Sequence, residues 1–202
     1  GVCLWRCAKA LCSFLTSEAG ASAVFRATKI RQRSSGMQEE DRGLIELGAG
    51  TGACGLLAAK LCGIRTLLTD GEEGALHQLR ANVRLNGVEG TTQVQRLAWS
   101  DPVANLRHMF GVVLASDCLY PGQSPSDITS FFEMAAKLLT QDADALFLLS
   151  YVSRGSWCDA FTRKVLHCAY GTGFRMHCLE PQAKEARGHS VPLILSLTLQ
   201  AE

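Results

Sequence analysis

Residues 44–52 of this 202-residue chain read Leu-Ile-Glu-Leu-Gly-Ala-Gly-Thr-Gly. A short apolar run ends here in glycines at every second position, Gly48, Gly50 and Gly52, directly before an Ala- and Leu-rich segment. Glycines at the carboxyl end of a strand let the backbone turn sharply and approach a ligand closely. The free N–H groups at the start of the following helix favour an anionic group such as a carboxylate or a phosphate. The stretch therefore predicts a strand–turn–helix unit that binds a cofactor.

The pattern on both sides of this unit alternates between strands and helices. Apolar or alternating runs predict strands over residues 43–47, 65–69, 92–98, 112–115, 145–151, 174–179 and 191–199. Apolar residues at helical spacing predict helices over residues 5–15, 51–62, 74–85, 127–139 and 156–169. Alternating strands and helices form right-handed βαβ units and a parallel sheet. The last two strands have only residues 181–192 between them and should pair antiparallel.

The predicted fold class is therefore α/β. We expect a Rossmann-like, seven-stranded, mostly parallel sheet with helices on both faces and a C-terminal antiparallel strand pair. A single domain should span residues 1–202, with residues 1–43 as an N-terminal helix and loop and residues 44–202 as the Rossmann-like core. Residues 21–42 are polar and of mixed charge, which predicts a solvated loop, with a partner-binding strip as the alternative.

The composition is that of an ordinary globular protein, with 47% hydrophobic and 19% charged residues. A formal net charge of +1 gives no strong field that would favour nucleic acid or a membrane surface. No apolar run reaches the roughly 18 residues of a membrane helix. The chain does not begin with Met, which leaves room for a segment upstream of Gly1.

Nine cysteines form no C-x-x-C pair and no zinc spacing, so no metal site is expected. Several lie in apolar segments and are predicted to be small buried hydrophobes, namely Cys3, Cys7, Cys12, Cys54, Cys62 and Cys118. A reducing compartment is the simplest interpretation, so we expect the cytoplasm, with the nucleus as an alternative.

Two acidic residues bear on the identity of the cofactor. Asp70 ends the second strand, 22 residues after Gly48, where its carboxylate can accept hydrogen bonds from both ribose hydroxyls of a nucleoside. The spacing Gly48-x-Gly50-x-x-Ala53 also matches a nicotinamide dinucleotide site. Glu46 favours S-adenosylmethionine (AdoMet), because an acid before the glycines suits the ammonium of a methionine moiety and would repel a pyrophosphate.

The end of the fourth strand carries a second group of candidates. Asp117 and Tyr120 should face the ligand crevice, which lies outside the carboxyl ends of the strands. In the alternative interpretation, Asp117 caps the next turn and Tyr120 packs on the sheet. Trp99 follows the third strand, where it could form a wall of the adenine pocket, and Trp5 lies on the first predicted helix; either could equally be ordinary core. The five histidines show no triad or metal spacing and are predicted to be structural or exposed.

Together these stretches resemble the seven-strand protein methyltransferases called methyltransferase family 16, which includes many protein lysine methyltransferases. The resemblance rests on the N-terminal Gly-x-x-x-Trp-x-x-Ala stretch of residues 1–8, the glycine motif of residues 44–52, Leu67-Leu-Thr-Asp70, Leu97-Ala-Trp99 and Asp117-Cys-Leu-Tyr120. The last of these matches the D-x-x-Y signature that distinguishes the family from other methyltransferases. Arg6, where members often carry an acid, and a longer segment over residues 21–42 are departures from the pattern.

The resemblance implies AdoMet contacts at Trp5, Gly48, Ala49, Gly50, Asp70, Trp99 and Ser116. It also implies that Asp117 and Tyr120 line the substrate entrance and are the catalytic candidates. The implied partner is a protein substrate, of a chaperone or translation type by resemblance, with a lysine side chain as the acceptor. Asp117 could orient the amine, whose pKa is lowered by desolvation near Tyr120, but Asp117 is not assigned as an obligate base.

Other functions stay open at this point. One alternative is a non-catalytic AdoMet-binding module that recruits partners. Another is a methyltransferase that acts on a small molecule or on nucleic acid, although the neutral charge argues against nucleic acid. A nicotinamide oxidoreductase is a more distant alternative.

Overall fold

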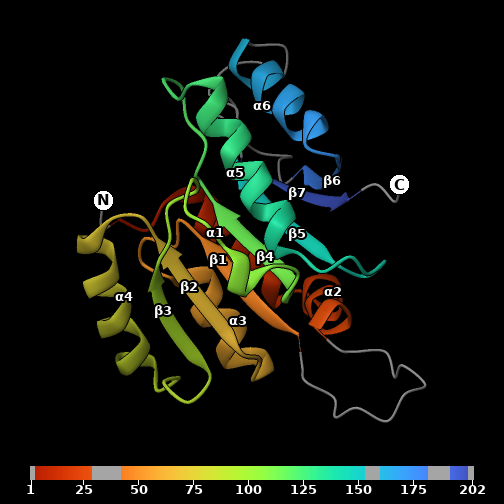
Figure 1. The fold of residues 1–202 in the computed structure, drawn as a ribbon. Coiled ribbons are helices and arrows are strands. Elements are labelled where there is room, and N and C mark those ends of the chain that lie inside the picture. Colours follow the sequence, from red (N-terminus) through yellow and green to blue (C-terminus); the bar gives the residue numbers. More distant parts are fainter. Residues whose placement is uncertain (1–2, 29–41, 153–159, 182–191, 200–202) are drawn as a thin grey trace.

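The computed structural model describes residues 3–28, 42–152, 160–181 and 192–199. Its centre is a seven-stranded sheet in the order β3-β2-β1-β4-β5-β7-β6 (Figure 1). The strands are β1 (Gly43–Leu47), β2 (Thr66–Asp70), β3 (Thr92–Arg96), β4 (Phe110–Ser116), β5 (Leu146–Tyr151), β6 (Phe174–Pro181) and β7 (Leu193–Leu199). The pairs among β1 to β5 are parallel, whereas β7 pairs antiparallel with both β5 and β6. The predicted fold class is confirmed, including the antiparallel pair at the C-terminal end.

Helices cover both faces of the sheet (Figure 1). They are α1 (Arg6–Thr16), α2 (Glu18–Thr28), α3 (Ala53–Cys62), α4 (Glu73–Asn86), α5 (Pro125–Leu138) and α6 (Ala160–Gly171), with a short 3-10 helix, η1, at Ala104–Leu106. Successive side chains of a strand point to opposite faces, so each buried strand contributes to two cores. Leu44 of β1 packs in the core under α1, α2 and α3, whereas Ile45 packs in the core under α5 and α6.

The N-terminal segment differs from the prediction. Residues 21–28 are not part of a loop but form most of α2, which buries Val24 and Ala27 against the sheet. The Ser17 hydroxyl accepts a hydrogen bond from the Gly20 N–H at 3.1 Å and so satisfies one of the free donors at the start of α2. Gly20 fits there because a side chain at this position would collide with the carbonyl of Phe14. The rest of the predicted loop, residues 29–41, lies outside the described residues, as do residues 156–159 of the last predicted helix.

The predictions for Trp5 and for three of the cysteines also need correction. Trp5 precedes α1 instead of lying on it, at the position where the chain enters the helix. Cys3 is exposed, and Cys12 and Cys62 are only partly buried, whereas Cys7, Cys54 and Cys118 are buried as predicted. Cys3 lies ahead of the helix that covers the sheet, so its apolar neighbours in sequence do not bring it into the core. Within the described residues, no helix is long and apolar enough to span a membrane.

Candidate functional site

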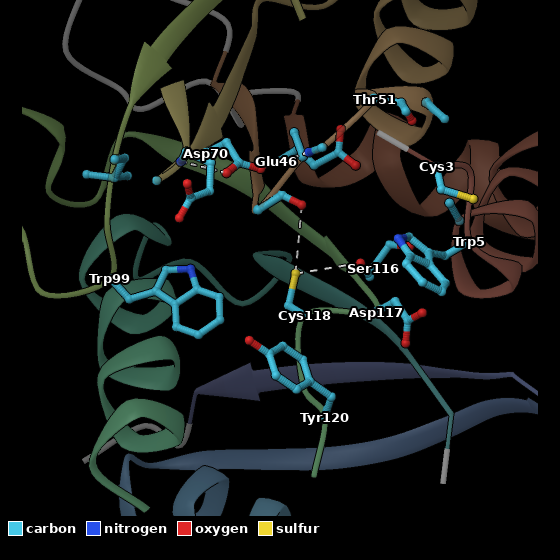
Figure 2. Close-up of a pocket in the computed structure, with 18 of the residues that line it drawn as sticks. Cys3, Trp5, Glu46, Thr51, Asp70, Trp99, Ser116, Asp117, Cys118 and Tyr120 are labelled. Atoms are coloured by element: carbon cyan, nitrogen blue, oxygen red, sulfur yellow. Dashed lines mark hydrogen bonds between the residues drawn. The ribbon is translucent and has the colours of Figure 1, made fainter. Parts of the chain in front are cut away.

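A pocket of about 410 Å³ opens at the carboxyl ends of β1, β2 and β4. The structure brings all ten predicted site residues to its walls: Trp5, Glu46, Gly48, Ala49, Gly50, Asp70, Trp99, Ser116, Asp117 and Tyr120. Figure 2 shows Asp70 and Trp99 at one end and Trp5 and Asp117 at the other. Residues from five stretches of the chain thus meet at one place. Four of these stretches lie at or after the carboxyl ends of β1 to β4, which share one edge of the sheet, and Trp5 joins them from the segment before α1.

The glycine turn forms the floor of this pocket and has a backbone that other residues rarely adopt. Gly48 and Gly50 have φ values of +59° and +54°, in the left-handed region where glycine meets no steric penalty. A Cβ on Gly48 would lie 2.9 Å from the Cys118 sulfur, whereas a Cβ on Gly50 would meet nothing within 4 Å. The space above Gly50 is therefore open for a ligand to approach the backbone.

Asp70 is tied directly to the glycine turn. One carboxylate oxygen accepts a hydrogen bond from the Gly50 N–H at 3.0 Å, and the other accepts from the Glu72 N–H at 3.0 Å. A carboxylate has about four acceptor sites, so both oxygens can accept further bonds from a ligand. The geometry suits a group that offers two neighbouring hydroxyls, as a ribose does.

Glu46 is the buried acid of the pocket, with only 2% of its surface exposed. Its Oε2 atom accepts a hydrogen bond from the Gly55 N–H in the first turn of α3 at 2.8 Å. Burial raises the pKa of the Glu46 carboxyl from 4.5 to about 8. A bound cation would reverse this effect, because an opposite charge nearby favours the ionised form.

The end of β4 holds Asp117 in an unusual conformation. Its φ is +56°, which is uncommon for a residue with a side chain, and its N–H donates to the Ser150 carbonyl at 3.0 Å. Such conformations cost roughly 1–3 kcal/mol and gather at functional sites. The buried Cys7 thiol of α1 lies against the Asp117 carboxylate, and burial together with this negative charge raises the pKa of the thiol.

The contacts after β4 bear on the alternative interpretations of Asp117 and Tyr120. The turn that follows is held by Gln123, whose side chain accepts from the Tyr120 N–H and donates to the Cys118 carbonyl, and α5 is capped by the Ser124 hydroxyl. Tyr120 is 50% exposed and so does not pack inside the sheet. Instead, Tyr120 and Asp117 line a second hollow of about 420 Å³ together with Trp5 and Pro121. This hollow shares Trp5, Asp117 and Tyr120 with the main pocket.

The two tryptophans differ in their surroundings. Trp99 is half-buried and packs edge-to-face on Phe131, with ring centroids 4.9 Å apart, so its orientation is fixed by the core. Trp5 is 53% exposed at the mouth. Ser116 lines the pocket, but its hydroxyl oxygen is buried and has no hydrogen-bond partner among the described residues.

Sequence reasoning missed two residues that shape the site. Cys118 lies beneath the glycine turn, where its thiol donates to the Leu47 carbonyl at 3.3 Å, and burial raises its pKa to about 12. Asp101 accepts a hydrogen bond from the Ala98 N–H at 2.8 Å and thereby orders the segment that carries Trp99. The sequence marked Cys118 only as a buried hydrophobe and gave no signal for Asp101.

The charges of the pocket bear on which ligand it can hold. Glu46, Asp70, Glu72 and Asp117 line it, whereas no Lys, Arg or His of the described ranges does. Four acids among the described lining residues disfavour a pyrophosphate, and they suit a ligand that carries cationic groups and hydroxyls. Within the same ranges, no cluster of His, Cys, Asp and Glu could hold a metal ion.

Comparisons with known proteins give a consistent result. The model of a family described as lysine methyltransferase matches residues 1–166. The chain is 25% identical over 176 residues to a calmodulin-lysine N-methyltransferase of Arabidopsis thaliana, covering 78% of this chain and 57% of that protein. It is 29% identical over 140 residues to the human protein-lysine N-methyltransferase EEF2KMT, covering 62% of this chain and 42% of the relative. The chain thus spans about half the length of these relatives.

Solved structures share the fold. The CurJ carbon methyltransferase superposes with a TM-score of 0.61 at 16% identity, covering 79% of this chain and 49% of that one. The glycopeptide N-methyltransferase MtfA superposes with a TM-score of 0.61 at 14% identity, and the match covers 78% of this chain and 89% of the MtfA chain. At such low identity the likeness concerns the architecture alone.

Proposed function

The chain belongs to the lysine methyltransferase family, and from that premise we propose that it transfers a methyl group from AdoMet to a lysine side chain of a protein. One observation carries the proposal. A single pocket joins the glycine turn, Glu46 and Asp70 to the hollow between Trp5, Asp117 and Tyr120. A donor site that opens into an acceptor site is what a transfer reaction needs. We further propose that residues 1–202 form one domain that carries both sites.

The proposed position of AdoMet follows the chemistry of the pocket walls. The methionine ammonium lies towards Glu46, and the carboxylate lies near the glycine turn at the start of α3. The ribose hydroxyls donate to Asp70, and the adenine packs near Trp99. Ala49 and Ser116 complete the walls through contacts close to the backbone.

The proposed acceptor is a lysine that enters between Trp5 and Tyr120. Asp117 and the aromatic faces attract the ammonium, since a cation near a Trp or Tyr ring gains from the ring quadrupole. The amine must lose its proton to water before its lone pair attacks the methyl carbon. The bond between carbon and sulfur then breaks, and the sulfonium becomes a neutral thioether. Asp117 holds the amine in line and is not assigned as the base.

The proposed partner is a protein. One relative's name specifies calmodulin, and another is called a protein-lysine N-methyltransferase. We propose a chaperone or translation-type substrate on the family resemblance, and a cytoplasmic or nuclear location on the cysteine pattern, which favours a reducing compartment.

The test is to incubate the purified chain with AdoMet labelled in its methyl group and with a cell extract. A labelled protein band that carries methyl-lysine, and that is lost with Asp117→Asn but kept with the matched control Asp144→Asn, would support the proposal. Asp144 lies in the turn before β5, outside both pockets. Label in small molecules or nucleic acid would overturn the acceptor class. Tight AdoMet binding without transfer to any fraction would favour a non-catalytic module.

A further inference from the structure

Two thiols from different parts of the chain meet behind the pocket. The sulfur of Cys12 in α1 lies 3.9 Å from the sulfur of Cys54 in α3, and both are free cysteines. Their positions are 42 residues apart in the sequence. A disulfide has a sulfur–sulfur distance of about 2.05 Å, so the two atoms need to approach by only about 1.9 Å to bond.

The two thiols have different environments, as an attacking and a resolving cysteine require. Cys12 is partly exposed, whereas Cys54 is fully buried. The contact between the two sulfurs lowers the pKa of Cys12 and raises the pKa of Cys54. The accessible thiol is therefore the better nucleophile of the pair.

The pair also lies directly behind the proposed cofactor site. Ala8 of α1 and Ala53 of α3 both line the pocket, and the Cys54 sulfur lies 3.7 Å from the Ala8 carbonyl oxygen. The Cys54 side chain also acts on the Glu46 carboxyl, whose pKa it lowers. A change at Cys54 would therefore reach both the wall and the buried acid of the pocket.

We infer that Cys12 and Cys54 form a reversible disulfide that weakens AdoMet binding under oxidising conditions. The oxidant is a peroxide. The Cys12 thiolate attacks one peroxide oxygen, the O–O bond breaks, and a sulfenic acid and hydroxide form. The Cys54 thiol then loses its proton and attacks the sulfenic sulfur, which releases water. Two thiols and one hydrogen peroxide thus give one disulfide and two waters, and a dithiol reductant reverses the change.

Two effects of the bond act on the pocket. Drawing the sulfurs together moves α1 against α3 and shifts the walls at Ala8 and Ala53. Cys54 also loses its thiol hydrogen, which favours the ionised form of Glu46. We expect the Kd of AdoMet to rise about tenfold, the effect of losing one hydrogen bond to a charged group. This consequence rests on the cofactor site proposed above, whereas the bond itself does not.

The chain permits a direct test of the bond. Trypsin should release residues 10–26, with Cys12 as their only cysteine, and residues 43–60, with Cys54 as theirs. The full chain is reduced, treated with hydrogen peroxide, blocked at its remaining thiols and digested. A peptide that joins these two segments and disappears after reduction is expected. Its absence, or pairing of either cysteine with another partner, would overturn the inference.

Calorimetry tests the effect on the cofactor. The oxidised chain should bind AdoMet about tenfold more weakly than the reduced chain, with recovery after dithiothreitol. Cys12→Ser and Cys54→Ser should each abolish this sensitivity to peroxide. Cys62→Ser, which removes another partly buried thiol of α3, should retain it. A linked peptide with an unchanged Kd would refute the regulatory role, and failure of the reduced chain to bind AdoMet would instead refute the proposed cofactor site.

Discussion

The Glu46→Gln substitution should stabilise the empty protein and weaken its binding of AdoMet. Glutamine has nearly the same shape and keeps an oxygen that can accept the hydrogen bond from the Gly55 N–H, which Glu46 accepts at 2.8 Å. What the substitution removes is the ionisable group. The two effects have opposite signs because burial opposes the negative charge, whereas the ammonium of AdoMet requires it.

The magnitude follows from the pKa of Glu46, which burial raises from 4.5 to about 8. Between these values the folded chain binds one more proton than the unfolded chain, so the free energy of unfolding falls as the pH rises. The slope is about 1.4 kcal/mol per pH unit, and the loss reaches roughly 3 kcal/mol at neutral pH. Glutamine carries no such penalty. The difference in free energy of unfolding between the variant and the wild type should therefore grow as the pH rises towards the folded-state pKa. At acidic pH the two free energies should become equal.

Urea denaturation of the empty protein at several pH values between about 5 and 8 measures this difference. The part of the pH dependence of the free energy of unfolding that Glu46 causes should be lost in the variant. Glu133→Gln is the matched control, since Glu133 is exposed and forms an ion pair with Lys137 on the surface of α5. Parallel pH profiles for the wild type and Glu46→Gln would refute the reasoning. Titration calorimetry should show AdoMet binding about 10- to 100-fold weaker in the variant, as expected for the loss of a charged hydrogen-bond partner.

Three further substitutions test separate parts of the site. Asp70→Ala should weaken AdoMet binding by roughly 1.5–3 kcal/mol through lost charge-assisted bonds to the ribose, and calorimetry would show whether it does. Gly48→Ala should lower the free energy of unfolding by about 1–3 kcal/mol in urea denaturation, because of its positive φ and its approach to Cys118. Asp117→Ala should reduce single-turnover methylation by about a hundredfold while AdoMet affinity stays within a few-fold, since displacements near 1 Å misplace the acceptor. Full activity of this last variant would remove Asp117 from the mechanism.

Local sequence patterns predicted the strands and the glycine turn because the physics behind them is local. Strand β1 begins and ends where predicted, at Gly43 and Leu47, since a run of apolar residues between a glycine and a glycine turn permits little else. The other strands and helices agree with the prediction to within a few residues. Positions at or just after the carboxyl ends of strands pointed to most of the ten site residues, whereas Trp5, Ala49 and Ser116 were named only from the family resemblance.

Helix α2 was missed because residues 21–28 were interpreted together with the charged residues that follow them. Its four alanines favour a helix, and burial of Val24 and Ala27 against the sheet stabilises it. A second local signal was Ser17 followed by Glu18, which was interpreted as the end of the first helix although Ser17 also caps the second. Contacts such as those of Cys12 with Cys54 join residues far apart in sequence, and no periodicity reveals them.

The order of residues at the end of β4 explains how the proposed donor and acceptor sites can keep a fixed position relative to each other. Cys118 donates to the Leu47 carbonyl and lies beneath the glycine turn, while Asp117 faces the hollow beside Trp5. The side chains of these two adjacent residues point in different directions, which requires a sharp turn of the backbone. The left-handed φ of Asp117 provides this turn. Because β4 is also paired with β1 along its length, the turn proposed to hold the methyl donor and the carboxylate proposed to orient the acceptor are joined by one part of the sheet. A transfer that depends on alignment near 1 Å gains more from this shared frame than from any single contact.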